Sequence, residues 1–427
     1  MNIGYACLAL AVPDTGIKKC LIKNASPDRL RELIRSNLDA LLNMVEYNIA
    51  NDIRLYRVSS DIIHFASSPV NNVPWAEEFK DRLAIIGGRI KESGMRVSMH
   101  PGQYTVLNSP DEKIAAAAAA ELDYHALFLD SLGVDATNKI ILHIGGVYGD
   151  KAAASERFIR RFQALPDNVR RRLVIENDDR SYNVSDVLEI SARAGIPVVF
   201  DNLHHMANPP ARTLSQEEWI KACAATWGLR DGRQKIHYSQ SDPDRKPGAH
   251  SASIHIDEFL NFHDSLAGEK PDIMLEVKDK NVSARKCLLC VEKFDKLNEL
   301  EREWGRYKYL VLEHSQSHYQ QIRELLKDKS SCPAIAFFRL VQSALDLPVD
   351  RGSAINTASH IWGYFKETAD SAQKRQYMKA LDAYAAGEGS LAAVKRRLYS
   401  LAEQHGQDYL LSSYYFLDPR AARTDQA

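Results

Sequence analysis

Histidine and acidic residues recur at the ends of successive β-rich runs of this sequence. In chain order they are His100, His143, Glu176, Asp201, His204, His237 and Glu276. His64 and His250 lie in the stretches that follow the second and seventh such runs. Neutral imidazole and carboxylate oxygen are ligands of Zn²⁺ and Mn²⁺, whereas structural zinc sites favour thiolates. The pattern therefore favours a metal site that does chemistry over one that only holds the fold.

Crowded carboxylates need a compensating cation, because otherwise their pKa values rise and they become neutral. Two or three metal ions, with Glu176 bridging a pair, would suit hydrolysis of a phosphodiester, since metal ions activate water and stabilise the attacking and leaving oxygens. Each residue alone also fits an ordinary role: a strand-end histidine can be a surface residue, and Glu176 can cap a helix. The placement of such residues at six successive strand ends favours the metal site.

These side chains must be positioned by a regular scaffold. Eight β-rich runs alternate with helical stretches, which predicts parallel strands. The runs are Ile3–Leu10, Ile53–Ser59, Arg96–His100, Lys139–His143, Leu173–Glu176, Pro197–Asp201, Lys235–Tyr238 and Ile273–Val277. The helical stretches are Asp28–Ala50, Trp75–Ser93, Lys113–Leu132, Ser155–Ala164, Val184–Ala194, Gln216–Ala225 and Ser283–Leu297.

Eight such units within residues 1–295 predict a closed (β/α)₈ TIM barrel, with an open doubly wound sheet as the alternative. In a barrel all the strand ends meet on one face, where the candidate ligands would converge. From residue 296 to residue 427 the strand pattern stops, and we expect a small all-α C-terminal domain. Its helices are predicted at Glu299–Leu326, Ala334–Ala344, Ala354–Phe365, Ala372–Ala386 and Ser390–His405. A DNA-binding or interaction role and a passive packing role are both open for this domain.

The composition limits the protein class. The chain has 427 residues, a formal net charge of -1, and six cysteines, too few for a disulfide scaffold. The sequence contains no apolar run of about eighteen residues, so no membrane span is predicted. It shows no secretory signal either, and we therefore expect a cytoplasmic protein. A DNA-binding surface would have to be a local basic patch. Basic residues near the predicted rim are Arg180, Arg230, Arg233, Arg245, Lys246, Lys278 and Lys280.

Several local motifs together resemble the UV damage endonuclease family over about residues 1–290. They are His100-Pro-Gly-Gln-Tyr104, Lys139-Ile-Ile-Leu-His-Ile-Gly-Gly146, Leu173-Val-Ile-Glu-Asn-Asp178, Phe200-Asp-Asn-Leu-His-His205, Lys235-Ile-His-Tyr-Ser239 and Ile273-Met-Leu-Glu-Val-Lys278. The family is related in fold to endonuclease IV and to xylose-isomerase-like barrels. The C-terminal segment resembles a small helical domain of unknown function that is appended to other bacterial proteins.

The resemblance implies an ATP-independent DNA repair endonuclease that hydrolyses the phosphodiester on the 5′ side of UV photoproducts, leaving a 3′-hydroxyl and a 5′-phosphate. Pyrimidine dimers, (6-4) photoproducts and abasic sites are the implied substrates. Damaged double-stranded DNA is the expected partner, with no nucleotide cofactor and no membrane. Manganese is the implied metal, as two or three ions, with Zn²⁺, Co²⁺ or Mg²⁺ as alternatives. We expect a monomer.

The resemblance also implies residue roles. One metal would be held by His100, His143 and Glu176; a second by Glu176, Asp201, His237 and Glu276; and a third by His204 and His250. Catalytic roles would fall to Glu176, His64, Lys235 and His237. Lys235 matches a lysine that can be carboxylated in the family. The alternative is an ordinary basic residue that meets a phosphate.

Lesion recognition is implied for three further residues. Gln103 and Tyr104 match a pair that wedges into the duplex where the damaged dinucleotide is flipped out, and a lesion costs less to extrude than intact DNA. Tyr104 could instead be a rim aromatic packed on a neighbouring loop. Tyr5 matches a tyrosine near the lesion pocket, but the Cys7–Leu10 stretch after it lacks the asparagine that the family often has there.

Three other functions remain open from the residues. A sugar isomerase or epimerase on the same barrel also uses His, Asp and Glu at strand ends, but has no need of Gln103 and Tyr104 as a duplex probe. An endonuclease IV-like enzyme would be confined to abasic sites. A nucleic-acid-binding protein with structural metals is disfavoured, because the ligand set is rich in oxygen and lacks thiolates.

Overall fold

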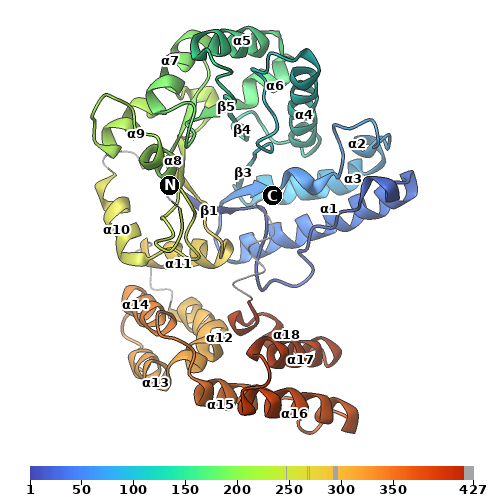
Figure 1. Cartoon of the computed structure of the whole chain (residues 1–427), viewed down its shortest axis with the longest axis vertical. Helices are drawn as coiled ribbons and strands as arrows, with labels where there is room; N and C mark the ends of the chain where they lie inside the picture. The colour runs from blue at the N-terminus through green and yellow to red at the C-terminus, as the bar shows by residue number, and fades with distance from the viewer. Residues whose placement is uncertain (247, 267, 269, 292–296, 418–427) are drawn as a thin grey trace. The chain divides into compact units, whose positions relative to one another are not determined.

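The computed structural model describes residues 1–246, 248–266, 268, 270–291 and 297–417 (Figure 1). The chain divides into two compact units. The first, here called the barrel unit, comprises Met1–Ala9, Asp14–Ile254 and Phe259–Arg285. The second, the helical unit, comprises Leu10–Pro13, His255–Glu258 and Lys286–Ala427. The predicted boundary between residues 295 and 296 falls at residues 292–296, which lie outside the described residues.

Eight parallel strands form the closed barrel that the sequence predicts, in the order β1 to β8 with β1 also paired to β8. The strands are β1 Ile3–Ala6, β2 Leu55–Val58, β3 Arg96–Met99, β4 Lys139–His143, β5 Leu173–Glu176, β6 Val198–Asp201, β7 Lys235–Tyr238 and β8 Asp272–Leu275. Nearly every strand residue is buried, as in parallel sheets covered on the outside by helices and filled inside by side chains. The open-sheet alternative is therefore wrong.

Helices surround this barrel in Figure 1. They are α1 Pro27–Ala50, α2 Trp75–Glu78, α3 Lys80–Glu92, α4 Glu112–Ser131, α5 Lys151–Ala164, α6 Asp167–Arg172, α7 Val184–Ala194, α8 Asn202–Ala207, α9 Gln216–Ala224, α10 Ile256–Ser265 and α11 Asn281–Val291. Their ends follow ordinary capping chemistry. Ser26 caps α1 by accepting a hydrogen bond from the Arg29 amide, with Pro27 at the first helical position.

Several sequence predictions for the elements of the barrel unit need correction. The first strand ends at Ala6 rather than Leu10, because Cys7 adopts a left-handed backbone (φ 68°) and turns the chain. The predicted helix over residues 75–93 is two helices, α2 and α3, that meet at Phe79. The helix α10 was not predicted, because the long stretch between the seventh and eighth strands was interpreted as a loop.

The helical unit contains α12 Leu297–His314, α13 Gln316–Leu325, α14 Ala334–Leu345, α15 Arg351–Trp362, α16 Ser371–Ala386, α17 Leu391–Gln404 and α18 Asp408–Leu411. The helix predicted over residues 299–326 is interrupted at Ser315, whose side chain caps α13. A core of this unit is built around stacked Trp362 and Tyr377 rings, 4.5 Å apart between centroids. In the described part of the chain, no helix combines the length and apolarity that crossing a membrane requires.

Two adjacent glycines in α3 give a matched test of barrel packing. A Cβ added at Gly87 would collide with the carbonyl oxygen of Leu132 at the end of α4, whereas one at Gly88 would meet nothing within 4 Å. We expect Gly87→Ala to lower stability by about 1–3 kcal/mol, because the two helices must move apart. Gly88→Ala should be neutral or stabilise by up to about 1 kcal/mol, since alanine is the better helix former. Thermal unfolding followed by circular dichroism measures both, and equal shifts in the two variants would contradict this packing.

Candidate metal centre

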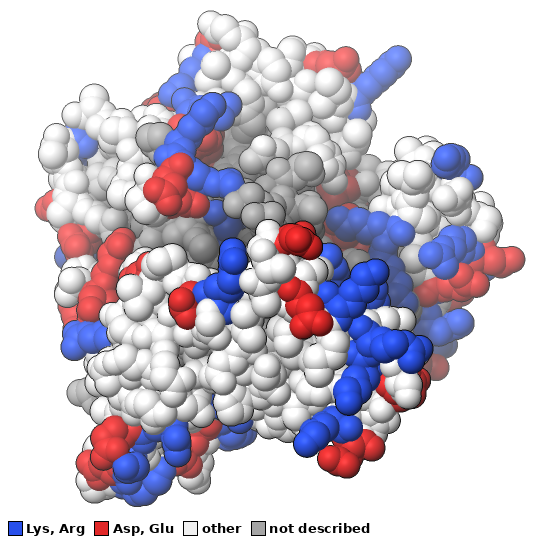
Figure 2. Space-filling view, turned by 60° about the horizontal axis from the view of Figure 1, so that its bottom comes forward, with Lys and Arg blue, Asp and Glu red and all other residues white. Residues whose placement is uncertain are grey.

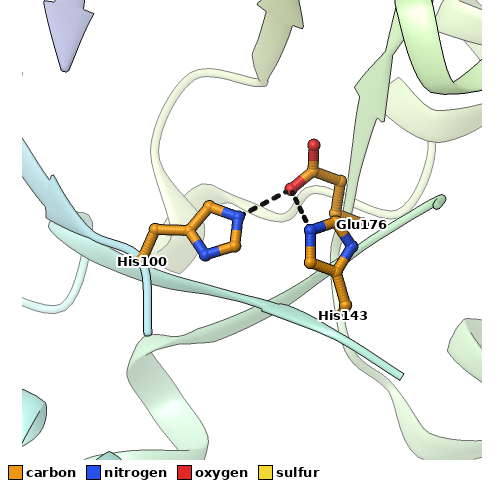
Figure 3. Close-up of side chains that lie close together, drawn as sticks. All are labelled: His100, His143 and Glu176. Atoms are coloured by element: carbon orange, nitrogen blue, oxygen red, sulfur yellow. Dashed lines mark hydrogen bonds and ion pairs between the residues drawn. The ribbon is translucent and has the colours of Figure 1, made fainter. Parts of the chain in front are cut away.

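The carboxylate of Glu176, at the end of β5, lies at the middle of the predicted ligand cluster. One of its oxygens, Oε2, is 3.1 Å from Nε2 of His100 and 3.8 Å from Nε2 of His143. Figure 3 shows both imidazoles turned toward this single carboxylate oxygen. The two histidines follow β3 and end β4, so three neighbouring strands bring the three side chains together.

The other oxygen of Glu176 faces a second pair of histidines. Oε1 is 2.8 Å from Nδ1 of His237 and 3.6 Å from Nδ1 of His204. The same His237 nitrogen lies 3.2 Å from Oε1 of Glu276, which directly follows β8. Asp201 accepts a 2.7 Å hydrogen bond from the His204 amide. Glu176 thus presents one oxygen to each half of the cluster, which is the arrangement that a bridging ligand needs.

Three overlapping ligand groups result, within each of which the candidate atoms lie within 4.8 Å of one another. They are His100, His143 and Glu176; Glu176, Asp201 and His204; and Asp201, His237 and Glu276. Oδ2 of Asp201 and Nε2 of His237 are buried and have no hydrogen-bond partner among the residues that the structure describes. Because a buried polar atom without a partner is costly, free donor atoms inside a nitrogen and oxygen cage fit a bound divalent cation.

The carboxylates have unusual protonation equilibria. Burial alone would raise the pKa of Glu176, but the surrounding histidines, His237 first, hold it well below its ordinary value. The pKa of Glu276 is likewise lowered, against the effect of burial, by Arg57 and His237. Burial and the two neighbouring carboxylates raise the pKa of Asp201. The cluster therefore concentrates negative charge that a cation would neutralise.

The imidazoles divide into two kinds. Burial lowers the pKa of His143 to about 4, which keeps its ring neutral and able to donate a lone pair. Burial acts in the same direction on His204, but Asp201 and Glu176 outweigh it and raise the pKa of His204 to about 9. A metal ion at His204 would therefore have to displace a proton.

Two asparagines that the sequence analysis missed fasten the strand ends together. Asn177 donates to the carbonyl of Asp201 at 3.0 Å and accepts from the Asp201 amide at 2.9 Å. Asn202 makes the same reciprocal pair with Ser239, both at 2.8 Å. Each asparagine directly follows a candidate ligand, and this shared position was the signal that could have identified them.

Arg57 on β2 is a third residue that was missed. Its guanidinium forms an ion pair with Glu276, and both side chains are nearly buried. Leu55 packs with Ala6 and Met274 in a buried cluster inside the barrel. Arg57 lies two residues after Leu55 on the same strand, and residues two apart on a strand point to the same face, so Arg57 also points inward. A charged residue near the end of a strand, at a position that alternation turns toward the barrel interior, was a sequence signal for Arg57.

Lys235 lies inside the barrel, two residues before His237 on β7. Its side chain is fully buried, and its Nζ has no hydrogen-bond partner among the described residues. Burial, together with the nearby cations Arg96 and Arg57, holds the pKa of Lys235 well below its ordinary value. A lowered pKa favours the neutral, nucleophilic form of the amine.

The two outlying histidines do not belong to any of the three ligand groups among the described residues. Nδ1 of His250 contacts the backbone carbonyl of Glu276 and lies 3.1 Å from the Ser239 hydroxyl, so this ring borders the cluster. His64 is largely buried, and its Nε2 lies 2.9 Å from the carbonyl of Cys20.

The structure corrects the assignment of Tyr5 to lesion contact. Tyr5 is 0% exposed, and its hydroxyl donates to Asn48 of α1 at 2.9 Å. Because Gly4 and Ala6 take the other face of β1, strand alternation turns Tyr5 outward between β1 and α1. Two predicted rim cations, Arg230 and Arg233, also need correction, because they precede β7 and so lie at the opposite end of the barrel from the ligand cluster.

The side chains of Gln103 and Tyr104 are exposed on the surface. Both residues belong to a turn after β3, and Tyr104 is 73% exposed, which is unusual for a tyrosine. The turn follows His100 by three residues and is therefore anchored beside the candidate ligands. The alternative of a rim aromatic packed on a neighbouring loop does not agree with this exposure.

Two family models match parts of this chain. Residues 1–307 match the family model described as UV-endonuclease UvdE, and residues 308–419 match a protein family of unknown function, DUF1722. A UV DNA damage endonuclease of Clostridium perfringens (strain 13 / Type A) is 43% identical over 354 residues, which cover 82% of this chain and 84% of that protein. A UV DNA damage endonuclease of Bacillus cereus (strain G9842) is 35% identical over 295 residues, covering 66% of this chain and 92% of that protein.

A solved structure shares the fold. The crystal structure of SacUVDE superimposes with a TM-score of 0.65 at 39% identity, over 70% of this chain and 99% of that one. The family model covers the entire barrel and most of the chain, and the two relatives are 43% and 35% identical to this chain. The chain belongs to the UV-endonuclease UvdE family.

Proposed function

We propose that this protein is a metal-dependent DNA repair endonuclease that hydrolyses the phosphodiester on the 5′ side of UV photoproducts. Pyrimidine dimers and (6-4) photoproducts are the proposed lesions, with abasic sites as further substrates, and neither ATP nor another nucleotide is required. The observation that carries the proposal is the position of Glu176, with one oxygen toward His100 and His143 and the other toward His237 and His204. We propose that a monomer acts on damaged double-stranded DNA.

The donor set suits two or three Mn²⁺ ions, with Zn²⁺, Co²⁺ or Mg²⁺ as alternatives, because it combines imidazole and carboxylate without thiolate. When bound, such ions supply Lewis acidity: they lower the pKa of water and neutralise charge on the phosphate. The chain itself holds the geometry. Asn177 and Asn202 fix the neighbouring strand ends, and Arg57 orients the carboxylate of Glu276.

Three further residues have proposed roles beside the cluster. His250 borders Glu276 and would complete the third ligand set with His204, and His64 would act close to the reacting phosphate. Lys235 is proposed to be carboxylated. A neutral buried amine is the form that reacts with CO₂, and Arg57 and Arg96, whose charges now disfavour an ammonium, would stabilise the resulting anion.

Lesion recognition is proposed for Gln103 and Tyr104. An exposed amide and an exposed aromatic ring at the tip of one turn can enter a duplex and fill the gap left by an extruded dinucleotide. A damaged dinucleotide stacks and pairs poorly, so its extrusion costs less than that of intact bases. The rival functions, a sugar isomerase or epimerase and an enzyme confined to abasic sites, are disfavoured by the family match over residues 1–307.

Metal-dependent incision is the first test of this proposal. Purified protein with Mn²⁺ should nick a UV-irradiated, end-labelled duplex immediately 5′ to the photoproduct, and chelator should abolish the nick. The unirradiated duplex should stay intact, since its bases resist extrusion. Gel mapping of the labelled fragments measures the position. Cutting of an abasic duplex alone would favour the endonuclease IV-like alternative, and no cutting of any DNA by folded, Mn²⁺-loaded protein would overturn the proposal.

Glu176→Gln tests the bridging carboxylate. The amide keeps the shape of the side chain but removes its negative charge, so we expect the single-turnover rate of incision to fall at least about a thousandfold, equivalent to about 4 kcal/mol of barrier. Manganese bound per protein, measured by atomic absorption, should fall in parallel. Glu189→Gln, at an exposed position of α7, is the matched control and should behave as the unmodified protein. Incision by the Glu176→Gln variant at the original rate would remove this residue from the mechanism.

Tyr104→Ala tests lesion insertion separately from the metal chemistry. We expect the variant to keep its manganese content but to lose about 10–100-fold in affinity for lesion duplex, because stacking of an aromatic ring on a base is worth roughly 1–3 kcal/mol. Affinity for undamaged duplex should change little. Fluorescence anisotropy with both duplexes measures the difference. Tyr148→Ala is a control at another exposed tyrosine. An equal loss on damaged and undamaged DNA would contradict a role in recognising the lesion.

A further inference from the structure

A basic groove runs between α16 and α17 of the helical unit. Its volume is about 610 Å³. Its floor is formed by three small side chains, Ala380, Ala383 and Ala393, and its walls carry three cations, Lys379, Arg396 and Arg397, with one amide, that of Gln376. The alanines keep the floor apolar and the groove open, and no carboxylate of the described residues lines it.

Helical spacing explains why these residues share one surface. Residues 376, 379, 380 and 383 are separated by three or four positions on α16, and residues 393, 396 and 397 follow the same spacing on α17. Side chains at such spacing lie on one helix face. Two antiparallel helices joined by the short turn around Gly387, whose backbone is left-handed (φ 83°), bring the two faces together.

The cations of this groove are available for a partner. Lys379, Arg396 and Arg397 are exposed, and no ion pair joins any of them to a carboxylate in the described part of the chain. Their neighbour Lys395 differs, because it is bound to Glu313 at 2.7 Å. Figure 2 shows Lys and Arg side chains gathered on the side of the helical unit where Figure 1 draws α16 and α17. The chain as a whole has a net charge of only -1, so this surface is a local concentration of positive charge.

We propose that the groove between α16 and α17 binds the phosphate backbone of duplex DNA, as a second contact surface apart from the metal centre. Cations on both sides of an open groove suit an extended polyanion, and neutralisation of phosphates does not depend on base sequence, so we expect a contact that is independent of sequence. The choice of DNA over other polyanions rests on the proposed function of the barrel unit. An acidic peptide is the alternative that the experiment must exclude.

The test compares two triple variants of the full-length chain. Lys379→Ala/Arg396→Ala/Arg397→Ala removes the groove cations. Lys327→Ala/Lys366→Ala/Lys374→Ala removes three exposed cations of the same unit outside the groove, and so matches the loss of charge. Binding of undamaged 40-base-pair duplex is measured by fluorescence anisotropy with chelator present, over a series of salt concentrations. Because no incision is required, a failure of the proposed endonuclease activity and a failure of this inference give different results.

The groove variant should bind undamaged duplex at least about tenfold more weakly at low salt. The slope of log K against log salt should become shallower by about 2–3, since each phosphate contact contributes roughly 0.9. The control variant should keep both values. Equal losses in the two variants, or no loss in the groove variant with its circular dichroism spectrum unchanged, would overturn the inference. Loss of binding to polyglutamate with full retention of DNA affinity would likewise overturn it, in favour of an acidic peptide.

Discussion

Three acidic side chains crowded at one end of a barrel are the constraint on which the rest of the site depends. Glu176, Asp201 and Glu276 are nearly or fully buried, and buried anions of like charge are tolerated only with compensation. Four imidazoles and the guanidinium of Arg57 supply part of it. Divalent cations would supply the remainder, and the mixture of imidazole and carboxylate is the composition that such ions accept.

The scaffold makes such crowding possible. The carboxyl ends of parallel strands in a closed barrel all lie on one face, so residues that are far apart in the sequence come close together there. Asn177 and Asn202 then bind each strand end to the next through paired hydrogen bonds with the backbone. The strands fix the backbone of the carboxylate residues, and the asparagines fix the spacing of neighbouring strand ends. The positions of the carboxylates therefore do not depend on a bound ligand. Such preorganisation is what electrostatic catalysis requires.

The two units divide the tasks of a DNA-acting protein differently. The barrel unit concentrates acidic side chains at its centre and carries an exposed Gln103–Tyr104 turn, features to which the proposed function assigns the chemistry and the recognition of a lesion. The helical unit has its own aromatic core and carries unpaired cations along one groove. A centre rich in carboxylates repels a phosphate backbone until cations are bound, so positive charge elsewhere on the chain is a physical advantage for holding DNA.

The residue pattern alone was enough to predict the fold class and most of the residues of the candidate ligand cluster. The repeat distance of apolar side chains distinguishes strands from helices, and the alternation of the two predicts a barrel. A barrel brings the carboxyl ends of β3 to β8 onto one face. The candidate ligands could therefore be identified without coordinates; they are His100, His143, Glu176, Asp201, His237 and Glu276. Where the local pattern is ambiguous, the face of a strand that a side chain takes depends on packing against the neighbouring strands and helices. Tyr5 turned outward to Asn48 rather than toward a lesion, because β1 ends at Ala6 and its inner face belongs to Gly4 and Ala6. The hydrogen bonds of Asn177 and Asn202 and the Arg57–Glu276 pair join segments distant in sequence, so the local pattern could mark these residues but not their partners. The groove between α16 and α17 follows from helical spacing on two consecutive helices, and it emerges only when these helices pack side by side.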